Sequence, residues 1–406
     1  MKAIGVVALF ASVVLACQPG VPNLSVGSVE YSTRPGSGEP NIHVTADGRA
    51  ILSWLEPAGE DRHALRLAVR DQDGWSEPLT VLESDRFFVN WADFPAAIEL
   101  ADGTWMAHWL EKVEGGSYAY HIKFALSHDG GQTWSDGVVP HRDDSPTEHG
   151  FVSMVPLEEG AAMIWLDGRA MKVPDAGEDH DGVDLGEMSL RGTRVSSDGA
   201  LGSDELLDSR VCECCQTALA VTSSGLIAAY RDRSEAEIRN ISAVRLAEGA
   251  WTQPAYVADD GWYYPGCPVN GPQLSALGDT VAVAWFTAPE RQPAVYVAFS
   301  VDAGATFGAP IRVDEGEALG RVDIELVAAD AAVVVWLERS ESAASLRARW
   351  VRRDGAASAA VTLAATSEAR QSGFPRIARV GDHVLVAWTS VRDDGGIRVT
   401  GLSWGD

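Results

Sequence analysis

The most regular feature of the sequence is a short apolar run that ends in an aromatic residue and recurs along the chain. Each copy predicts a β-strand, because a few apolar residues without helical spacing are bounded by polar or glycine-rich turns. The aromatic residues of the seven copies are Trp54, Trp109, Trp165, Tyr230, Trp285, Trp336 and Trp388. They lie 55, 56, 65, 55, 51 and 52 residues apart. This period predicts stacked units that cannot bury their faces alone.

A second short strand precedes every copy, and further strands follow it. The preceding strands are predicted at 41–45, 94–100, 150–156, 216–222, 272–277, 323–328 and 374–380. We therefore predict an all-β chain folded as a β-propeller of four-stranded blades, with seven blades favoured and six as the alternative. The last unit ends after its third strand, near 397–404, so we expect a strand near 28–33 to supply the fourth and close the ring.

Two tight turns share a sequence that points to a family. Residues 127–134 read S-H-D-G-G-Q-T-W, and residues 300–307 read S-V-D-A-G-A-T-F. In each turn the Asp can accept hydrogen bonds from the backbone N–H groups that follow it, and Gly supplies positive φ. Residues 196–199 look like a partial third copy. With these Asp boxes the chain resembles the sialidase-like (BNR-repeat) β-propellers, in which the box is a structural turn away from the catalytic mouth.

The N-terminus has the layout of a secretory signal. Its apolar run, 3–14, is too short for a membrane-spanning helix. The sequence V-L-A-C that ends at Cys17 resembles a bacterial lipobox, which makes Cys17 the lipidated first residue. The alternative is an ordinary signal peptide with Cys17 incidental. We predict a signal peptide at 1–17, a tether at 18–38 and the propeller at 39–406, in a protein exported and lipid-anchored in the bacterial cell envelope, in the periplasm or at the cell surface.

Composition restricts the partners. The 406 residues carry a formal charge of −26, which argues against binding to nucleic acid or anionic lipid. A polyanionic ligand would need a local basic pocket. We therefore expect a carbohydrate or another small envelope ligand, a monomer, membrane contact through the lipid anchor only, and no cofactor.

Candidate site residues lie where the chain enters the innermost strands or leaves the second strands, because both places open on one face of a propeller. The candidate catalytic residues are Asp93, Glu148, Tyr264 and Asp323. The candidate ligand-binding residues are His149, Arg169, Arg231, Arg233, Asn270, Arg321 and Arg376. For any one of these charges, the alternative is a salt bridge that holds neighbouring blades together.

The family resemblance implies a more specific chemistry. A true sialidase holds its substrate carboxylate with three arginines, uses a Tyr–Glu pair as nucleophile and an Asp as acid/base. The resemblance would place the arginine cluster at Arg231, Arg233, Arg321 and Arg376, the acid at Asp93 or Asp323, and the glutamate at Glu148 or Glu237.

The chain departs from that pattern. The family's Phe-Arg-Ile-Pro motif is absent, and the similar letters Phe-Pro-Arg-Ile at 374–377 lie in the last unit. No tyrosine follows Tyr296, whereas the family's nucleophile comes late in the chain. Three functions therefore stay open: a propeller that binds a glycan or other ligand at its mouth without converting it, a sialidase-type exo-glycoside hydrolase, and a protein-docking scaffold. If the protein is an enzyme, we expect the hydrolase.

Four cysteines besides Cys17 lie in two loops that enter neighbouring blades. An even number in an exported chain indicates disulfides. We predict the pairs Cys212–Cys267 and Cys214–Cys215, while Cys214–Cys267 or Cys215–Cys267 with two thiols are the alternatives. A soft-metal site of thiolates is the rival hypothesis. The oxidising compartment and the non-standard Cys-x-Cys-Cys spacing argue against it, so no metal is predicted.

Overall fold

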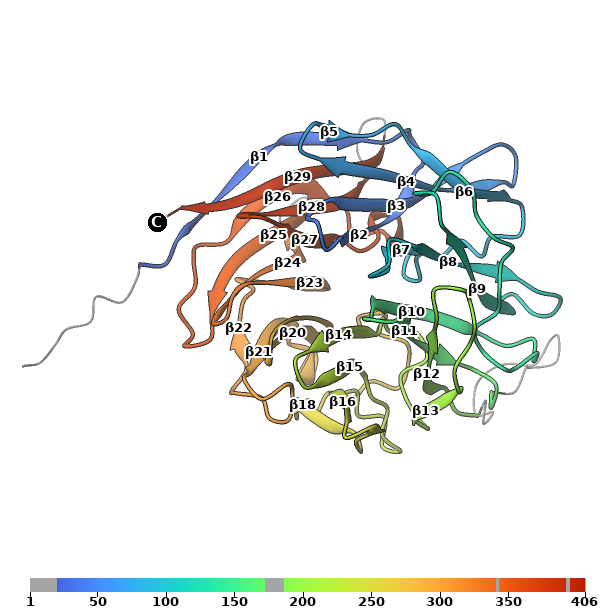
Figure 1. Ribbon diagram of the computed structural model, residues 1–406. Helices are drawn as coiled ribbons and strands as arrows, with labels where there is room; N and C mark the ends of the chain where they lie inside the picture. Colours follow the sequence, from blue (N-terminus) through green and yellow to red (C-terminus); the bar gives the residue numbers. More distant parts are fainter. Residues whose placement is uncertain (1–19, 172–185, 341–342, 392–394, 406) are drawn as a thin grey trace, which may run out of the picture.

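Seven small antiparallel sheets are arranged in a ring in the computed structural model (Figure 1), and residues of all seven line a central channel. The structure describes residues 20–171, 186–340, 343–391 and 395–405, and the predicted signal peptide with Cys17 lies outside them. The helices in this part of the chain are two 3-10 turns, η1 (Pro289–Arg291) and η2 (Arg370–Ser372). None of the described helices is long and apolar enough to cross a membrane. The all-β propeller with seven blades is confirmed, and the six-bladed alternative is wrong.

The two innermost strands of every blade coincide with the predicted repeat. The strands nearest the channel are β2 (Gly38–Val44), β7 (Ala96–Glu99), β10 (His149–Pro156), β14 (Ala218–Thr222), β19 (Gln273–Leu277), β23 (Ala318–Ala328) and β27 (Arg376–Val380). The second strands, which carry the aromatic residues of the repeat, are β3 (Ala50–Pro57), β8 (Trp105–Lys112), β11 (Ala161–Asp167), β15 (Gly225–Arg231), β20 (Thr280–Thr287), β24 (Ala331–Ser340) and β28 (His383–Ser390).

The outer half of each blade is less regular. The third strands are β4 (His63–Asp71), β9 (Tyr120–Ser127), β12 (Ser189–Val195), β16 (Ile241–Ala247), β21 (Ala294–Ser300), β25 (Ala343–Arg352) and β29 (Gly396–Gly405). The outermost strands are β5 (Gly74–Trp75), β6 (Leu79–Ser84), β13 (Glu205–Asp208), β17 (Ala250–Trp251), β18 (Ala255–Ala258), β22 (Ile311–Arg312) and β26 (Val361–Thr366).

The N-terminal strand closes the ring. Strand β1 (Asn23–Ser32) pairs antiparallel with β29 and completes the seventh blade, as predicted. Closure in this way removes an open sheet edge from a blade that would otherwise end at its third strand. Because β1 begins at Asn23, the propeller starts inside the segment predicted as a tether.

The second blade departs from the prediction of four strands. It has three described strands, β7, β8 and β9, and its outer edge is a single bridge between Phe124 and Val138. Gly137 and Pro140 flank that bridge. Proline has no N–H for a sheet ladder, and glycine has no side chain to pack against the neighbouring strand, so the pairing stops after one bridge.

The aromatic residues of the repeat form the core of the ring. Trp54, Trp165, Trp285 and Trp336 are fully buried. A buried indole N–H needs an acceptor. The indole nitrogens of Trp54, Trp165 and Trp336 each donate to an acid two residues later, at 3.4, 2.8 and 3.0 Å. These acids, which lie at or near the ends of the second strands, therefore support the core.

The two predicted Asp-box turns have the same hydrogen bonds. Asp129 accepts from the backbone N–H of Thr133 at 2.9 Å and from its hydroxyl at 2.6 Å. Asp302 accepts from the corresponding groups of Thr306 at 2.9 and 2.6 Å. Both turns follow a third strand.

Strand direction defines the two faces of the ring. In every blade the first three strands are antiparallel neighbours. The loop that enters an inner strand therefore lies on the same face as the loop between the second and third strands. We call this the mouth face. The Asp-box turns lie on the opposite face.

Candidate functional site

The central channel is a polar cavity of about 480 Å³ that all seven inner strands line. Its acidic and arginine side chains are Asp93, Asp323, Glu325, Arg376 and Arg379. Asp93, Asp323 and Arg376 lie at the mouth end, where the inner strands begin. Three of the predicted site residues therefore meet at the channel.

The hydroxyl of Tyr120 lies between two predicted catalytic carboxyl groups. It donates to Glu148 Oε1 at 2.7 Å and lies 3.2 Å from Asp93 Oδ2. One hydroxyl hydrogen serves one acceptor well, so a proton on a carboxyl group best satisfies the second contact. Gly150 makes the arrangement possible, because a Cβ there would lie 2.0 Å from Asp93 Oδ2.

Burial favours the protonated forms of the Asp93, Glu148 and Tyr120 side chains. It raises the pKa of Asp93 to about 8, although the N–H of Phe151 donates to Asp93 Oδ1 at 2.8 Å and favours the charged form. Burial also raises the pKa of Glu148 to about 7, and the pKa of Tyr120 well above its ordinary value. Tyr120 has no exposed surface and stacks on Phe88, with ring centroids 3.9 Å apart. The phenol is thus closed to solvent and hard to ionise.

Asp323 joins the sixth blade to the seventh. Its carboxylate accepts the N–H groups of Ile324 at 2.9 Å and Ile377 at 2.8 Å. Burial raises its pKa, while the Arg376 guanidinium opposes that shift. Asp93 holds the N–H of Phe151 in the next blade in the same way. Both predicted acids therefore contribute to the joints between blades as well as to the channel wall.

Arg231 and Arg321 do not form a carboxylate clamp. Arg231 is 1% exposed and donates to the carbonyl oxygens of Asn270, Arg239 and Phe286 at 2.6–2.8 Å. Arg321 donates to three carbonyl oxygens of residues 368–373 at 3.0–3.3 Å. Asn270 accepts the backbone N–H of Arg321 at 2.7 Å. These predicted ligand-binding residues fix the loops of the mouth face.

Arg233 is neutralised by carboxylates. It forms ion pairs with Glu213 and Glu237, and Arg239 pairs with the same two residues at 3.0 and 2.8 Å. The arginine cluster that the sialidase resemblance implies is therefore absent from the described residues, because three of its four predicted members are bound to carbonyl groups or acids.

Arg376 is the one of the four predicted arginines that is not held by carbonyl groups or by two acids. Its Nε lies 3.4 Å from Asp323 Oδ2, and its guanidinium carbon lies 5.5 Å from the ring centre of Phe94. No hydrogen bond joins its guanidinium to another described residue, and its side chain is 18% exposed. Arg376 therefore has donors available to a ligand in the channel.

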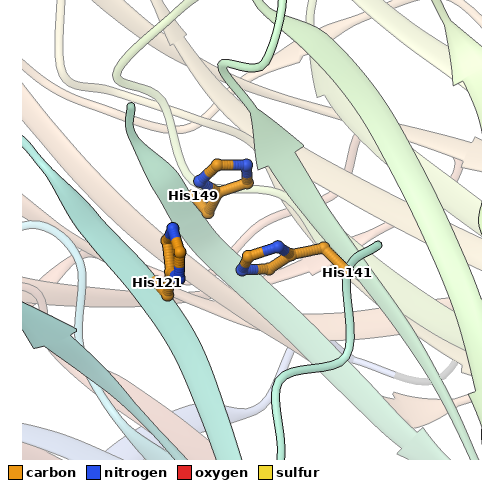
Figure 2. A group of neighbouring side chains, drawn as sticks. All are labelled: His121, His141 and His149. Atoms are coloured by element: carbon orange, nitrogen blue, oxygen red, sulfur yellow. The ribbon is translucent and has the colours of Figure 1, made fainter. Parts of the chain in front are cut away.

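Three histidines gather on the mouth face beside the Tyr120 group (Figure 2). His121 is the second residue of β9 in blade 2, His141 lies in the loop to blade 3, and His149 begins β10. The ring centroids of His141 and His149 are 4.0 Å apart, and those of His121 and His149 are 5.2 Å apart. The sequence had indicated only His149 for this site.

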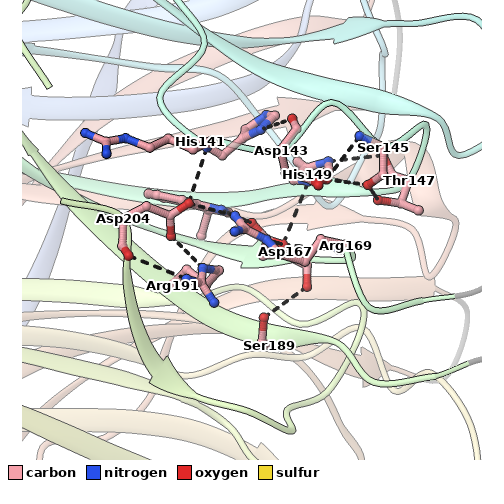
Figure 3. A network of polar contacts seen from close by, with 12 residues as sticks. His141, Asp143, Ser145, Thr147, His149, Asp167, Arg169, Ser189, Arg191 and Asp204 are labelled. Carbon is pink, nitrogen blue, oxygen red and sulfur yellow. Dashed lines mark hydrogen bonds and ion pairs between the residues drawn. The ribbon is translucent and has the colours of Figure 1, made fainter. Parts of the chain in front are cut away.

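A network of acids and arginines extends from these histidines (Figure 3). His149 Nε2 lies 3.1 Å from Asp143 Oδ2 and 3.8 Å from Asp167 Oδ1. Arg169 bonds to Asp167 at 2.6 Å and to Asp204 at 2.8 Å. Arg169 is thus held by two acids in blade 3, and it does not reach the channel cavity.

Tyr264 lies at the rim of the mouth and not within a catalytic group. It is 40% exposed, its neighbour Tyr263 is 61% exposed, and its carbonyl accepts a bond from Arg239 Nε at 3.1 Å. No carboxylate bonds to its hydroxyl among the described contacts. Tyr120, whose hydroxyl contacts two carboxyl groups at the mouth, was missed because it starts a third strand and not an inner one.

The cysteine pairing predicted first is wrong. The disulfide joins Cys214 to Cys267, with the Cα atoms 6.0 Å apart. Cys212 and Cys215 are free, buried thiols whose sulfur atoms lie 2.8 Å apart. The loop turns Cys212 and Cys215 inward and leaves Cys214 facing the neighbouring loop, so adjacent Cys214 and Cys215 point apart.

Solved structures share this fold at low identity. An ulvan lyase, a polysaccharide lyase of a new family, is 12% identical over 91% of this chain and 94% of its own, with a TM-score of 0.59. The polysaccharide lyase Uly1 is 8% identical over 93% and 92%, with a TM-score of 0.53. A protein of unknown function from Dyadobacter fermentans is 14% identical over 95% and 100%, with a TM-score of 0.54. No protein-family model and no curated protein matches the sequence. The similarity shows the β-propeller fold alone.

Proposed function

We propose that the protein is an envelope-anchored propeller that binds a neutral glycan at the mouth of its channel without converting it. The observation that carries this proposal is the polar cavity lined by Arg376, Asp323 and Glu325, with exposed tyrosines at the rim of the same face. A concave site with a few hydrogen-bonding groups suits a sugar, whose hydroxyl groups both donate and accept. Tyrosine rings offer a flat surface to the C–H groups of a sugar.

The charges favour a neutral ligand over an acidic one. The cavity holds three carboxyl groups and two arginines, and Arg379 donates to backbone carbonyl oxygens at 2.7 and 2.9 Å. Arg231, Arg233 and Arg321 are bound elsewhere. An acidic sugar would find Arg376 alone, beside Asp323, in a protein of charge −26.

Two neighbours of the same fold are described as polysaccharide lyases, which is consistent with a carbohydrate partner. Their identities of 12% and 8% carry no residue roles to this chain.

A glycan array tests the proposal. We expect the wild type to bind neutral oligosaccharides and not their sulfated or carboxylated counterparts. Arg376→Gln should lower the signal, whereas Arg353→Gln, on the exposed turn of the opposite face, should not. Binding of acidic glycans alone, or equal binding by both variants, would contradict the proposal.

A sialidase-type hydrolase is the second candidate, because one observation favours it. Tyr120, Glu148 and Asp93 form a hydrogen-bonded group of the residue types that the resemblance implies. Burial of the phenol and the missing arginine cluster argue against it. A fluorogenic sialoside assay decides between the two: we expect no turnover. Turnover that is abolished in Tyr120→Phe would establish the hydrolase instead.

The anchoring is proposed from the sequence. The V-L-A-C motif that ends at Cys17 would place acyl chains at the N-terminus of the mature protein. Strand β1 begins six residues after Cys17. The propeller would therefore lie close to the membrane surface to which it is anchored.

A further inference from the structure

The three histidines of the mouth face are arranged as metal ligands. One nitrogen of each ring lies within 4.8 Å of a nitrogen of the others. His141 and His149 are buried, at 4% and 0% exposure. His121 comes from β9 of blade 2, His141 from the loop that follows it, and His149 from β10 of blade 3. The cluster therefore lies at the interface between blades 2 and 3 (Figure 2).

The second nitrogen of each ring is held by a backbone carbonyl of one short loop. His141 Nδ1 lies 2.9 Å from Asp143 O, His121 Nε2 lies 3.1 Å from Ser145 O, and His149 Nδ1 lies 3.2 Å from Thr147 O. A carbonyl only accepts, so each of these nitrogens carries the hydrogen. The three lone pairs are then on His121 Nδ1, His141 Nε2 and His149 Nε2. Metal-bound histidines are oriented in this way by their other N–H.

Two of these lone pairs face no hydrogen-bond donor among the described residues. His141 Nε2 is buried and has no hydrogen-bond partner there. His149 Nε2 faces the carboxylate oxygens of Asp143 at 3.1 Å and Asp167 at 3.8 Å, which are acceptors too (Figure 3). Two acceptors in contact are unfavourable unless a cation lies between them. The cluster is therefore incomplete without one.

We propose that His121, His141 and His149 bind a divalent transition-metal ion of the Zn²⁺ type, with Asp143 as the fourth ligand. Imidazole and carboxylate are ligands that Zn²⁺ accepts in tetrahedral sites. A Zn–N bond of about 2.1 Å requires ligand nitrogens about 3.4 Å apart. The nearest nitrogens of the three rings, which lie within 4.8 Å of one another, would close by about 1.4 Å at most. The proposal departs from the prediction that the protein holds no metal.

The ion would be structural. Four protein ligands leave no open position for a substrate. The site would join blade 2 to blade 3, and His121 and His149 directly neighbour Tyr120 and Glu148 in the sequence. Metal binding would thus hold the Tyr120–Glu148 contact in place. The inference does not depend on the proposed glycan.

Metal titration of the full chain in detergent, without a histidine tag, tests the proposal. After chelator treatment and dialysis, Co²⁺ should bind with one equivalent and give the visible absorption of a tetrahedral site, and Zn²⁺ should displace it. Zn²⁺ should also raise the melting temperature, because it binds the folded state. His141→Ala should lose the Co²⁺ spectrum. His128→Ala, an exposed histidine of the same blade, should keep it.

Two further results separate this site from the alternatives. The double variant Cys212→Ser/Cys215→Ser should retain one equivalent of Co²⁺, since the thiols are not ligands. If Co²⁺ binding disappears in that variant and survives in His141→Ala, the site is wrong. A folded wild type that binds neither Co²⁺ nor Zn²⁺ would overturn the proposal. The positive charge between His149 and Asp143 would then come from a second proton on the His149 ring.

Discussion

Cys214 is bonded to Cys267, and this bond ties the loop that enters blade 4 to the loop that enters blade 5. The two residues are 53 apart in the sequence. The chain-entropy model gives about 4 kcal/mol for a loop of that size. We therefore expect Cys267→Ser to lower the free energy of unfolding by about this amount, measured by denaturant titration.

Cys212→Ser is the matched control, because Cys212 is buried but not in the disulfide. This variant should leave the disulfide intact.

Thiol counting checks the pairing in a protein that carries Cys17→Ser as its only substitution. Two thiols, Cys212 and Cys215, should react after denaturation without reductant, and both should react slowly in the folded protein because they are buried. Four thiols, or none, would contradict the pairing.

Asp93 should make stability depend on pH. A buried acid whose folded pKa is raised to about 8 stabilises the fold at low pH, and this contribution is lost as the pH rises from about 4 to about 8. Asp93→Asn has no such titration. The stability of Asp93→Asn minus that of the wild type should therefore rise over that range, by at most about 1.4 kcal/mol per pH unit.

Melting temperatures between pH 5 and 9 measure this difference, with exposed Glu158→Gln as the control. Both proteins share the repulsion of the large negative charge, so the subtraction removes it. Parallel curves for Asp93→Asn and the wild type would show that Asp93 is ionised throughout.

The lipid anchor is tested by metabolic labelling. A fatty-acid analogue should mark the wild type and not Cys17→Ser, because only the cysteine of the lipobox accepts the acyl chains. The variant should also move from the membrane fraction to the soluble fraction. Equal labelling of both proteins would rule out the anchor.

The fold could be predicted because each blade buries an apolar second strand with an aromatic residue near its end. In three blades the acid two residues later accepts the indole N–H, as Asp167 does for Trp165. The recurrence of these apolar strands sets the period in the sequence. The missing outer strand of blade 2 was not predictable, because the Asp-box that precedes it is intact and only Gly137 and Pro140 distinguish it.

The site was harder to predict because the residue types at the mouth do not reveal which groups each side chain bonds to. Arg231 and Arg321 have the expected position, yet backbone carbonyls occupy their guanidinium groups. The partner of Cys267 likewise depends on which way the loop turns Cys214 and Cys215. His121 and Tyr120 could have been found by extending the mouth positions to the starts of third strands, since those starts share the same face.

The central claim is that the mouth binds a neutral glycan without converting it. Calorimetric titration with a neutral oligosaccharide from the glycan array tests it most directly, and chromatography of the same mixture then shows whether the sugar has changed. We expect saturable binding at one site, weakened roughly tenfold or more in Arg376→Gln by loss of hydrogen bonds to a charged group, and recovery of the oligosaccharide unchanged. Equal affinity of the two proteins would place the ligand elsewhere. New reducing ends that depend on Tyr120 would show that the mouth is an active site.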